Sequence, residues 1–523
     1  MPGTTDSSSD APAGARRLGP RGTNARRPAA VATSLASIAA MGVALPLLLG
    51  GCAALFRPAP PQPGAVDFTE PLRVPALAES TIEGDTRVFS LTADEARSAF
   101  VPQGETPTLG YNGDYLGPTL VAERGERVRI DVQNDLAAAT TVHWHGMHLP
   151  AAQDGGPHHP IAPGDASHPE WSIDQPAATL WYHPHLHEAT REQVDAGLAG
   201  MFLVRDEHEA ALELPREYGV DDFPLIVQDR SFDEAGGFDS DVGQFDGALG
   251  DTVLVNGAIG PYLDVTTERV RLRLLNGSSA RMYDFAFADD RPFELIASDG
   301  GLLSAPVASK SIALSPGERA EIVVSMAAGE SVVLRSDAPN PDLHAGGDAF
   351  DVLELRAAAS LLPSPAVPAA LADLPIPDEG DVAAERSFDM SGHDINDREM
   401  DMTRTDFVAE VGTSEVWSVT NTNPLPHSFH VHDTQFRILS IDGASPPSHL
   451  AGFKDTIALE WNRTYRLLVR FDDYADPTTP YMYHCHLLWH EDQGMMGQFL
   501  VVEPGQKPAL KTHEGEIDDR HDH

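Results

Sequence analysis

The C-terminal part of the chain contains Tyr483-His484-Cys485-His486-Leu487-Leu488-Trp489-His490-Glu491-Asp492-Gln493-Gly494-Met495, and upstream of it His427-Ser428-Phe429-His430-Val431-His432. A donor set of two imidazoles, one thiolate and one thioether is typical of a blue-copper electron-transfer site with a weak axial methionine. His427, Cys485, His490 and Met495 supply that set. Zinc uses cysteine and histidine too, but a structural zinc site is closed by four good donors, and a thioether is a poor donor to zinc. The sequence therefore predicts copper.

Eight further histidines form four His-Xaa-His pairs: His143 and His145, His183 and His185, His430 and His432, and His484 and His486. On a strand, residues two apart point to the same face with Cα atoms roughly 6.6 Å apart. Each pair is therefore better placed to bridge neighbouring metals than to chelate one. The same alternation puts Cys485 on the face opposite its two flanking histidines. One tripeptide is thus expected to contact a blue-copper site and a multinuclear cluster.

An internal repeat organises the chain, with Asn134, Asn276 and Asn421 as its anchors. Each asparagine follows a run that reads as a strand: Arg127 to Gln133, Arg269 to Leu275, and Glu415 to Thr420. The copies also begin alike, at Asn112, Asn256 and Asn396. Copies start about 140 residues apart, which suits one β-sandwich domain each.

The middle copy lacks the ligand pattern. Counting nine and eleven residues on from each anchor gives His143 and His145 in the first copy and His430 and His432 in the third, but Phe285 and Phe287 in the second. Phenylalanines at these positions are expected to fill a core. Because the paired histidines come half from the first copy and half from the third, the cluster is expected at the interface between those two copies.

These four histidine motifs, in this order, resemble those of the multicopper oxidases, the laccase-like enzymes. The resemblance implies an all-β fold of three consecutive cupredoxin-like Greek-key β-sandwich domains and four coppers per chain. His427, Cys485, His490 and axial Met495 would hold the type 1 copper. His143 and His430 would hold the type 2 copper. One type 3 copper would take His145, His183 and His484, and the other His185, His432 and His486.

The expected organisation has seven parts. They are an export signal peptide of the lipoprotein type (1–51), a Pro-rich lead-in (52–80), domain 1 with half of the cluster ligands (81–207), domain 2 without copper (208–356), a linker rich in Ala and Pro (357–385), domain 3 with the type 1 site and the other half of the cluster ligands (386–505), and an acidic, His-containing tail (506–523).

Two acidic residues match the family's carboxylates near the oxygen site. Asp154 lies eleven residues after His143, and Glu491 directly follows His490. A carboxylate beside metal-bound water can exchange protons, so both are candidate proton relays. The alternatives are a turn residue for Asp154 and a surface acid for Glu491.

The N-terminus carries five arginines before an apolar, Ala-rich stretch from Ala29 to Gly51, which is typical of an export signal. Leu48-Leu49-Gly50-Gly51-Cys52 resembles a bacterial lipobox, whose cysteine becomes a lipidated N-terminus. An ordinary cleavage site beside an unrelated cysteine is the alternative. We expect an exported protein of the cell envelope, anchored through Cys52 on the outer face of the cytoplasmic membrane or periplasmic.

The charge excludes one class of partner. Removing residues 1–51 takes away five Arg and two Asp, so that 31 basic and 77 acidic residues remain and the net charge is −46. Such a surface repels nucleic acid. The acidic residues serve mainly as a solvated surface, with attraction of cations as a lesser role.

The leading functional hypothesis is a laccase-like oxidase that takes single electrons from phenolic or aromatic small donors and reduces dioxygen to water. The alternative is a cuprous oxidase in copper tolerance, with Cu(I) as the donor. Only Met390, Met400 and Met402 precede the third-copy motifs, without a long Met run, which favours organic donors. A copper-binding envelope protein without enzymatic activity is the lesser alternative.

Overall fold

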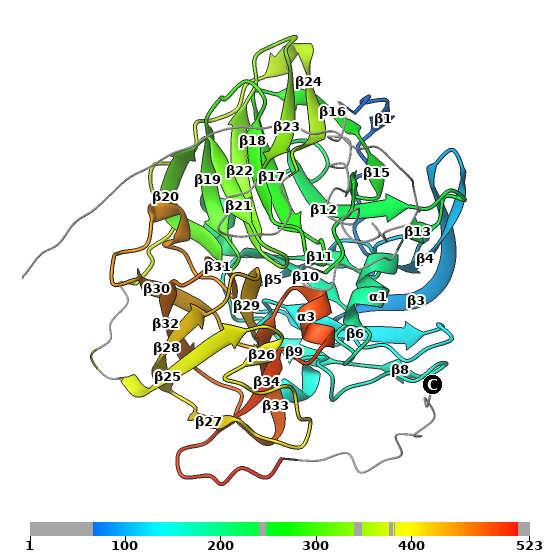
Figure 1. Ribbon diagram of the computed structural model, residues 1–523. Coiled ribbons are helices and arrows are strands. Elements are labelled where there is room, and N and C mark those ends of the chain that lie inside the picture. The colour runs from blue at the N-terminus through cyan, green and yellow to red at the C-terminus, as the bar shows by residue number, and fades with distance from the viewer. Residues whose placement is uncertain (1–65, 240–246, 339–347, 376–379, 381, 511–523) are drawn as a thin grey trace, which may run out of the picture. The chain divides into compact units, whose positions relative to one another are not determined.

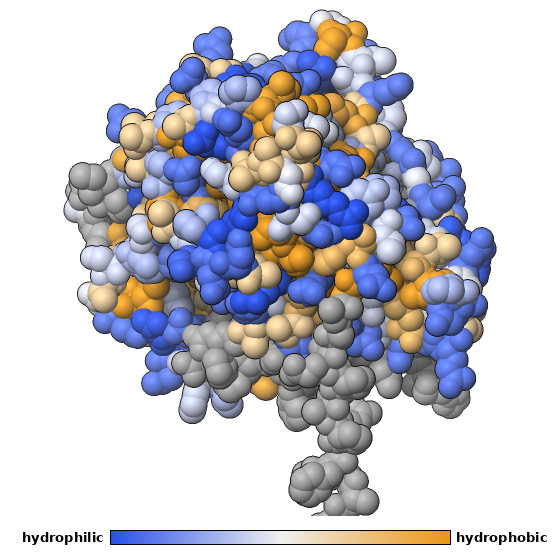
Figure 2. Space-filling view, turned by 90° about the horizontal axis from the view of Figure 1, so that it is seen from above, coloured by the Kyte–Doolittle hydropathy of each residue, from blue (hydrophilic) through white to orange (hydrophobic). Residues whose placement is uncertain are grey.

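The structure is a computed structural model that describes residues 66–239, 247–338, 348–375, 380 and 382–510. The predicted signal peptide, Cys52 and most of the acidic tail lie outside these residues. Within the described ranges, no helix is long and apolar enough to cross a membrane. Figure 2 shows that hydrophilic and apolar residues are interspersed over one face of the molecule.

Strands dominate the described residues, and their six sheets fall into three pairs along the chain (Figure 1). The paired sheets are the layers of three consecutive cupredoxin-like sandwiches, so the predicted fold class is confirmed. In each pair the apolar residues of both sheets face one another, and each sandwich has its own buried core. The domain limits given above stay predictions.

The first pair of sheets has the strand orders β2-β3-β6-β8, with β4 beside β3 and β9 beside β6, and β5-β11-β10-β7. Its strands are β2 Ser80–Glu83, β3 Thr86–Val101, β4 Gly104–Tyr111, β5 Leu120–Glu123, β6 Arg127–Asn134, β7 His143–His145, β8 Ala166–Ser167, β9 Glu170–Ser172, β10 Ala178–His183 and β11 Gly200–Arg205. Its helices are the 3-10 turn η1 Ala151–Gln153, α1 Thr190–Ala196 and α2 Glu207–Ala211.

The second pair has the orders β1-β16-β24-β23-β18-β21 and β15-β14-β12-β17-β22-β19-β20, with β13 beside β12. Its strands are β1 Glu70–Pro71, β12 Asp222–Phe232, β13 Phe238–Asp239, β14 Thr252–Val255, β15 Ala258–Ile259, β16 Pro261–Thr267, β17 Arg269–Asn276, β18 Tyr283–Phe287, β19 Phe293–Ser298, β20 Gly301–Ser309, β21 Ser311–Leu314, β22 Arg319–Ser325, β23 Ser331–Asp337 and β24 Phe350–Leu362.

The third pair has the orders β26-β25-β28-β32-β30 and β27-β34-β33-β29-β31. Its strands are β25 Val382–Ser391, β26 Asp394–Ile395, β27 Phe407–Glu410, β28 Thr413–Asn421, β29 His427–Val431, β30 Phe436–Ile441, β31 Thr456–Leu459, β32 Thr464–Phe471, β33 Asp476–Cys485 and β34 Met496–Val502. Its helices are the 3-10 turn η3 Ser448–Leu450 and α3 Leu488–Asp492.

The same two parallel pairings recur in every sandwich. Strands β3 and β6, β12 and β17, and β25 and β28 run parallel in one sheet of each pair. In the other sheet, β5 and β11, β16 and β24, and β27 and β34 are parallel. Parallel neighbours cannot be joined by a hairpin, so the chain must cross between the two sheets, as in a Greek key.

The predicted anchors of the repeat make the same hydrogen bonds in all three copies. The side-chain amides of Asn134, Asn276 and Asn421 are buried, and each donates to two backbone carbonyls, one four or five residues further along and one on another strand or loop. Each side-chain oxygen accepts from the backbone N–H two residues on. The asparagine therefore shapes the turn that leads from one sheet to the first ligand position in the other.

In the middle sandwich, Phe285 and Phe287 are fully buried in the core. The expectation that phenylalanine replaces ligands there to fill a core is confirmed. The first and third sandwiches contain histidines at the equivalent positions.

Two predicted irregular segments contain strand structure. Within the predicted lead-in, β1 adds a parallel strand to the middle sandwich beside β16. Within the predicted linker, β24 continues to Leu362 and β25 begins at Val382. A composition rich in Ala and Pro predicts a linker, but strand pairing needs only free backbone groups, and β24 pairs with β16 and β23.

The first and third sandwiches are in direct contact. Asp492 at the end of α3 accepts hydrogen bonds from the backbone N–H groups of Thr190 and Arg191 at the start of α1, at 2.9 and 3.0 Å. The N–H groups of a first helical turn have no partner within their own helix, so this carboxylate satisfies two of them across the interface. Histidines from the two sandwiches are brought together beside this contact.

Candidate metal centre

Two strands of the first sandwich position its histidines. Strands β7 and β10 are antiparallel, with His143 opposite His183 and His145 opposite Trp181. His185 follows β10, and its backbone N–H donates to Thr141 Oγ1 at 2.6 Å. In the third sandwich, β29 and β33 are antiparallel, with His430 opposite His484 and Phe429 opposite Cys485. All ten histidines of the predicted sites have at most 1% of their surface exposed.

Three imidazoles from the two sandwiches form a closed triangle. The Nε2 atom of His185 lies 3.1 Å from that of His484 and 3.2 Å from that of His432, and the Nε2 atoms of His432 and His484 are 3.2 Å apart. Nitrogens bound to one metal at roughly 2.0 Å in a tetrahedral arrangement would be separated by about 3.3 Å. The spacing therefore fits three nitrogens that share one metal ion.

This triangle corrects the predicted division of the type 3 ligands. His484 groups with His185 and His432, and the prediction that it joins His145 and His183 is wrong. The cause is strand register. His484 lies opposite His430 and so diagonally next to His432, whereas the backbone N–H of His486 bonds to Ser428, two places further from His432. His486 instead lies with its ring centroid 4.9 Å from that of His145 and 5.3 Å from that of His183.

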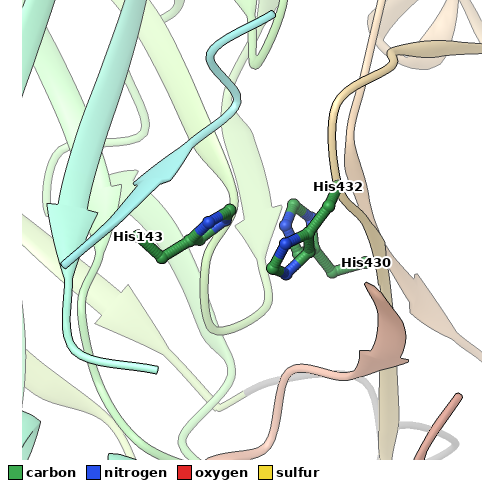
Figure 3. Close-up of side chains that lie close together, drawn as sticks. All are labelled: His143, His430 and His432. Carbon is green, nitrogen blue, oxygen red and sulfur yellow. The ribbon is translucent and has the colours of Figure 1, made fainter. Parts of the chain in front are cut away.

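The two histidines predicted for the type 2 copper are oriented alike. Nδ1 of His143 bonds to the backbone carbonyl of Asp154 at 3.0 Å, and Nδ1 of His430 to that of Asp455 at 2.9 Å. In both rings Nε2 is buried without a hydrogen bond. Figure 3 shows the His143 ring pointing toward the rings of His430 and His432, and the His143 and His432 rings stack with centroids 3.8 Å apart. Each carbonyl thus fixes a tautomer that leaves Nε2 as an acceptor for a metal.

Among the histidines around His145, His486 has ring nitrogens without a hydrogen bond as well. Nδ1 of His183 bonds to the carbonyl oxygen of Pro184 at 2.7 Å, and its Nε2 lies 3.4 Å from Nδ1 of His145. Neither ring nitrogen of His486 has a hydrogen bond. Buried polar atoms without protein partners are costly, so a cluster of them indicates a ligand-binding site. Copper, which imidazoles bind well, fits these donors.

The predicted type 1 ligands meet on the other face of β33. Sγ of Cys485 lies 3.7 Å from Nδ1 of His427 and 3.6 Å from Nδ1 of His490. A metal roughly 2.0 Å from nitrogen and 2.3 Å from sulfur would separate them by about 3.5 Å. Met495 is buried in the same core, and its backbone bonds to both Cys485 and His490. The expected placement of Cys485 on the face opposite His484 and His486 is confirmed.

Comparisons with known proteins place the chain in a family. Two family models, both described as multicopper oxidase, match residues 94–209 and 370–505. The multicopper oxidase mco of Staphylococcus epidermidis is 37% identical over 82% of this chain and 92% of its own length. The chain belongs to the multicopper oxidase family. It is therefore a copper-dependent oxidoreductase with dioxygen as its electron acceptor.

Other relatives of this multicopper oxidase differ in what they are named for. The cell division protein FtsP of Edwardsiella tarda is 37% identical over 83% of this chain and 93% of its own length. Among solved structures, the multicopper oxidase of Pediococcus acidilactici has 35% identity and a TM-score of 0.78, over 84% of this chain and 93% of that one. The laccase-like multicopper oxidase CueO of Ochrobactrum sp., described as active towards lignin model compounds, has 37% identity and a TM-score of 0.77, over 83% and 100%.

The two predicted relay carboxylates both touch metal-site histidines. Oδ2 of Asp154 lies 2.8 Å from Nδ1 of His432, and its Oδ1 lies 3.3 Å from Nδ1 of His143. Oε1 and Oε2 of Glu491 lie 3.4 and 3.3 Å from Nδ1 of His185 and of His484. Both carboxylates have 1% of their surface exposed, so Glu491 is not a surface acid. Asp154 ends the 3-10 turn η1, and its carboxylate also contacts metal-site histidines.

The pKa values of the two carboxylates are shifted in opposite directions. The pKa of Asp154 is lowered despite its burial, because His432 and His143 favour the ionised carboxylate. The pKa of Glu491 is raised well above its ordinary value, first by burial and then by the nearby charge of Asp492. The surroundings therefore favour the ionised form of Asp154 and the protonated form of Glu491 beside the same cluster.

Sequence reasoning missed Asp455 of the third sandwich. Its Oδ1 lies 3.0 Å from Nε2 of His145, and Arg319 of the middle sandwich binds both its oxygens at 2.6 and 2.7 Å. The middle domain therefore helps to position a predicted copper ligand. A signal was present in Gly452 to Leu459, where a lysine and an aspartate interrupt an apolar run that reads as a strand. Lys454 is buried as well, 2.9 Å from Asp299 and from Glu318.

Proposed function

We propose that this multicopper oxidase is laccase-like and holds four coppers. It would couple the one-electron oxidation of phenolic or aromatic donors to the four-electron reduction of dioxygen to water. The observation that carries the proposal is the Nε2 triangle of His185, His432 and His484, joined through β33 to the cysteine site. The proposed ligands are His427, Cys485, His490 and Met495 for type 1, His143 and His430 for type 2, and His145, His183, His486 and His185, His432, His484 for the type 3 pair.

The bound coppers would supply one-electron redox chemistry, and the chain supplies the path between them. Cys485 contacts the type 1 site, while its covalent neighbours His484 and His486 contact the cluster. Electrons therefore need to cross only one tripeptide. Burial of all three residues keeps water away from this route and holds the ligands in place before metal binds.

We propose that Asp154 accepts and Glu491 donates protons at the cluster. Replacing Glu491 by Gln keeps the side-chain size but removes the exchangeable acid, so kcat is expected to fall about 10- to 100-fold, as for other outer partners of metal ligands. Copper content and the blue absorption should stay unchanged, because no ligand is lost. Oxygen uptake with metal analysis of the same sample measures both.

Two results would contradict the relay. Loss of copper together with activity would show that Glu491 only orients His185 and His484, and an unchanged kcat would show that it has no role in turnover. Asp492→Asn is the matched control: Asp492 is the neighbouring half-buried acid and bonds to backbone groups of α1. Removing its charge should leave the pKa of Glu491 raised, because burial is the larger cause of that shift.

The organic donor is favoured by the position of the methionines. Met390 is fully buried in the third core, so it offers no surface thioether to an incoming Cu(I) ion. Met400 and Met402 are half-buried beside the loop that follows His490, where Met400 donates its backbone N–H to Gly494 at 2.8 Å. The Ochrobactrum relative is named for lignin model compounds, whereas a 27% identical Campylobacter jejuni enzyme is named as a metallo-oxidase.

Oxygen uptake with a methoxyphenol and with Cu(I), measured on one copper-loaded preparation, distinguishes the two donors. We expect the larger kcat/KM for the phenol, and we expect the double variant Met400→Leu, Met402→Leu to leave both rates within about twofold, because leucine conserves the volume. A cuprous oxidase would be established instead if the wild type oxidised Cu(I) faster than the phenol and the double variant lost rate with Cu(I) but not with the phenol. A blue protein that consumes no oxygen with either donor would leave a copper-binding envelope protein.

We propose further that residues 1–51 direct export and that Cys52 carries a lipid anchor, so that the enzyme works in the cell envelope. The sequence supports this through the arginines, the apolar stretch and the residues before Cys52. In a periplasm or outside the cell, free thiols are oxidised, and the buried, metal-bound Cys485 would be protected.

A further inference from the structure

A histidine and three aspartates meet at the junction of the first and third sandwiches, outside the four copper motifs. His148 follows β7 and Asp174 follows β9 in the first sandwich. Asp433 follows β29 and Asp473 follows β32 in the third. The resemblance to multicopper oxidases assigns no role to these four residues.

Two of the carboxylates face the same ring nitrogen. Oδ1 of Asp473 lies 2.9 Å from Nε2 of His148, and Oδ1 of Asp433 lies 3.4 Å from it. Asp174 lies on the opposite side of the ring, with its Oδ1 3.6 Å from Nδ1. The ring of Tyr474 packs edge-on against His148 with centroids 5.2 Å apart, which covers the group from one side.

Asp433 has an unsatisfied side chain in this group. Its side chain is 1% exposed, and neither carboxylate oxygen accepts a hydrogen bond of good geometry, although the backbone N–H of Leu149 approaches it. Oδ1 of Asp473 is also buried without a hydrogen bond. A buried carboxylate without donors is destabilising unless a positive charge compensates it.

Among the residues that the structure describes, nearby cations do not balance the charge of the group. With all three carboxylates ionised, as metal binding requires, a protonated His148 would offset only one of three negative charges. Arg124 interacts with Asp174, on the far side of the ring, and Arg470 pairs with Asp472 instead of Asp473. A surplus of negative charge therefore remains where Asp433 and Asp473 converge.

We propose that His148 Nε2, Asp433 and Asp473 bind a divalent cation that joins the first and third sandwiches. One imidazole and two carboxylates suit zinc or a similar first-row ion better than calcium or magnesium, which prefer oxygen donors alone. Ligands roughly 2.0 to 2.1 Å from one ion would lie about 3.3 Å apart, close to the two distances to Nε2. Asp174 would accept from Nδ1–H and hold the ring in the ligating tautomer.

Such an ion would stabilise the interface that the copper cluster needs. Of the three ligands, His148 belongs to the first sandwich and Asp433 and Asp473 to the third, so the ion would link the two sandwiches directly. Asp433 also follows His432, so the ion would fix the end of the loop that carries a proposed copper ligand. A zinc ion would do this without redox activity, which separates it from the four coppers.

Equilibrium dialysis of the copper-loaded protein against Zn²⁺, followed by metal analysis, tests the site. We expect one zinc per chain in addition to unchanged copper, and a higher first unfolding midpoint with zinc than without. Asp473→Asn removes a ligand whose side chain is 35% exposed, so the variant should still fold. It should lose the zinc and the shift in the unfolding midpoint. Asp472→Asn, which alters the adjacent aspartate outside the group, should keep both.

The outcomes are independent of oxidase activity, so failure of the proposed function leaves this test intact. Equal zinc binding by the wild type and Asp473→Asn would overturn the site, as would zinc uptake that displaces copper one for one. No zinc binding by the wild type would also overturn it and would indicate a proton as the occupant. Burial raises the pKa of Asp433 to about 8, so a proton is the competing ligand there.

Discussion

Replacing Cys485 by Ser is expected to abolish the blue absorption and to lower the oxidase rate by more than the roughly 100-fold that loss of an outer partner of a metal ligand costs. The thiolate is both the strongest donor of the type 1 site and the only covalent link from that site to His484 and His486. A hydroxyl at this position binds copper weakly and carries no electrons at a useful rate.

Cys485 is expected to become a thiolate only when metal binds. Burial raises the pKa of Cys485 to about 12, so without metal the group is a neutral thiol at neutral pH. Binding of copper must release its proton, and metal affinity should therefore weaken as the pH falls. A visible spectrum, copper content and oxygen uptake, taken on the same preparation of Cys485→Ser, measure the three effects.

Met496→Leu provides the matched control. Met496 is buried next to Met495 and lies opposite His484 on β34, so its replacement tests packing in the same place. It should keep the blue absorption and most of the activity. The type 1 assignment would be refuted if Cys485→Ser stayed blue, or if Met496→Leu lost the colour and Met495→Leu did not change it.

The metal-free protein is expected to lose stability steeply as the pH falls below about 6.5, the ordinary pKa of histidine. Eight buried histidines have lowered pKa values, first because of burial and then because of their neighbours; they are His145, His183, His185, His427, His430, His432, His484 and His486. Between their unfolded and folded pKa values, only the unfolded chain binds the protons.

The sign of the effect follows from this proton uptake. Since the unfolded state binds more protons, the free energy of unfolding rises with pH through the window and falls on acidification, by up to about 1.4 kcal/mol per histidine and pH unit. The loss begins near pH 6.5 and continues to about 4 for His432 and about 3 for His486. Glu491 and Asp299, whose pKa values burial raises, oppose it in part.

Thermal unfolding at pH 7.5 and pH 5 tests this expectation. We expect the first midpoint of the metal-free protein to fall by about 10 °C or more, given this uptake of protons. The copper-loaded protein should change much less until protons displace the metal, because copper holds the imidazoles unprotonated. Equal decreases in the unfolding midpoints of the metal-free and copper-loaded proteins would show that the histidines are not the cause.

The sequence by itself determined the donors and the architecture. The types and spacings of His427, Cys485, His490 and Met495 indicate a blue-copper donor set without any knowledge of how the strands are arranged. Likewise, the three asparagine anchors predict three copies of one domain, because each makes local hydrogen bonds that depend on residues a few places away. The alternation of β33 put Cys485 opposite its neighbours, since that is a property of any strand.

Only the tertiary structure decided which distant groups meet. The exchange of His484 and His486 between the two type 3 sets depends on the register of β33 against β29, which no local pattern specifies. Asp455 beside His145, and His148 beside Asp433, depend on how the sandwiches dock. Local spacing fixes the face on which a side chain lies, but contacts across an interface follow from packing of the whole surfaces, and a single sequence does not show that packing directly.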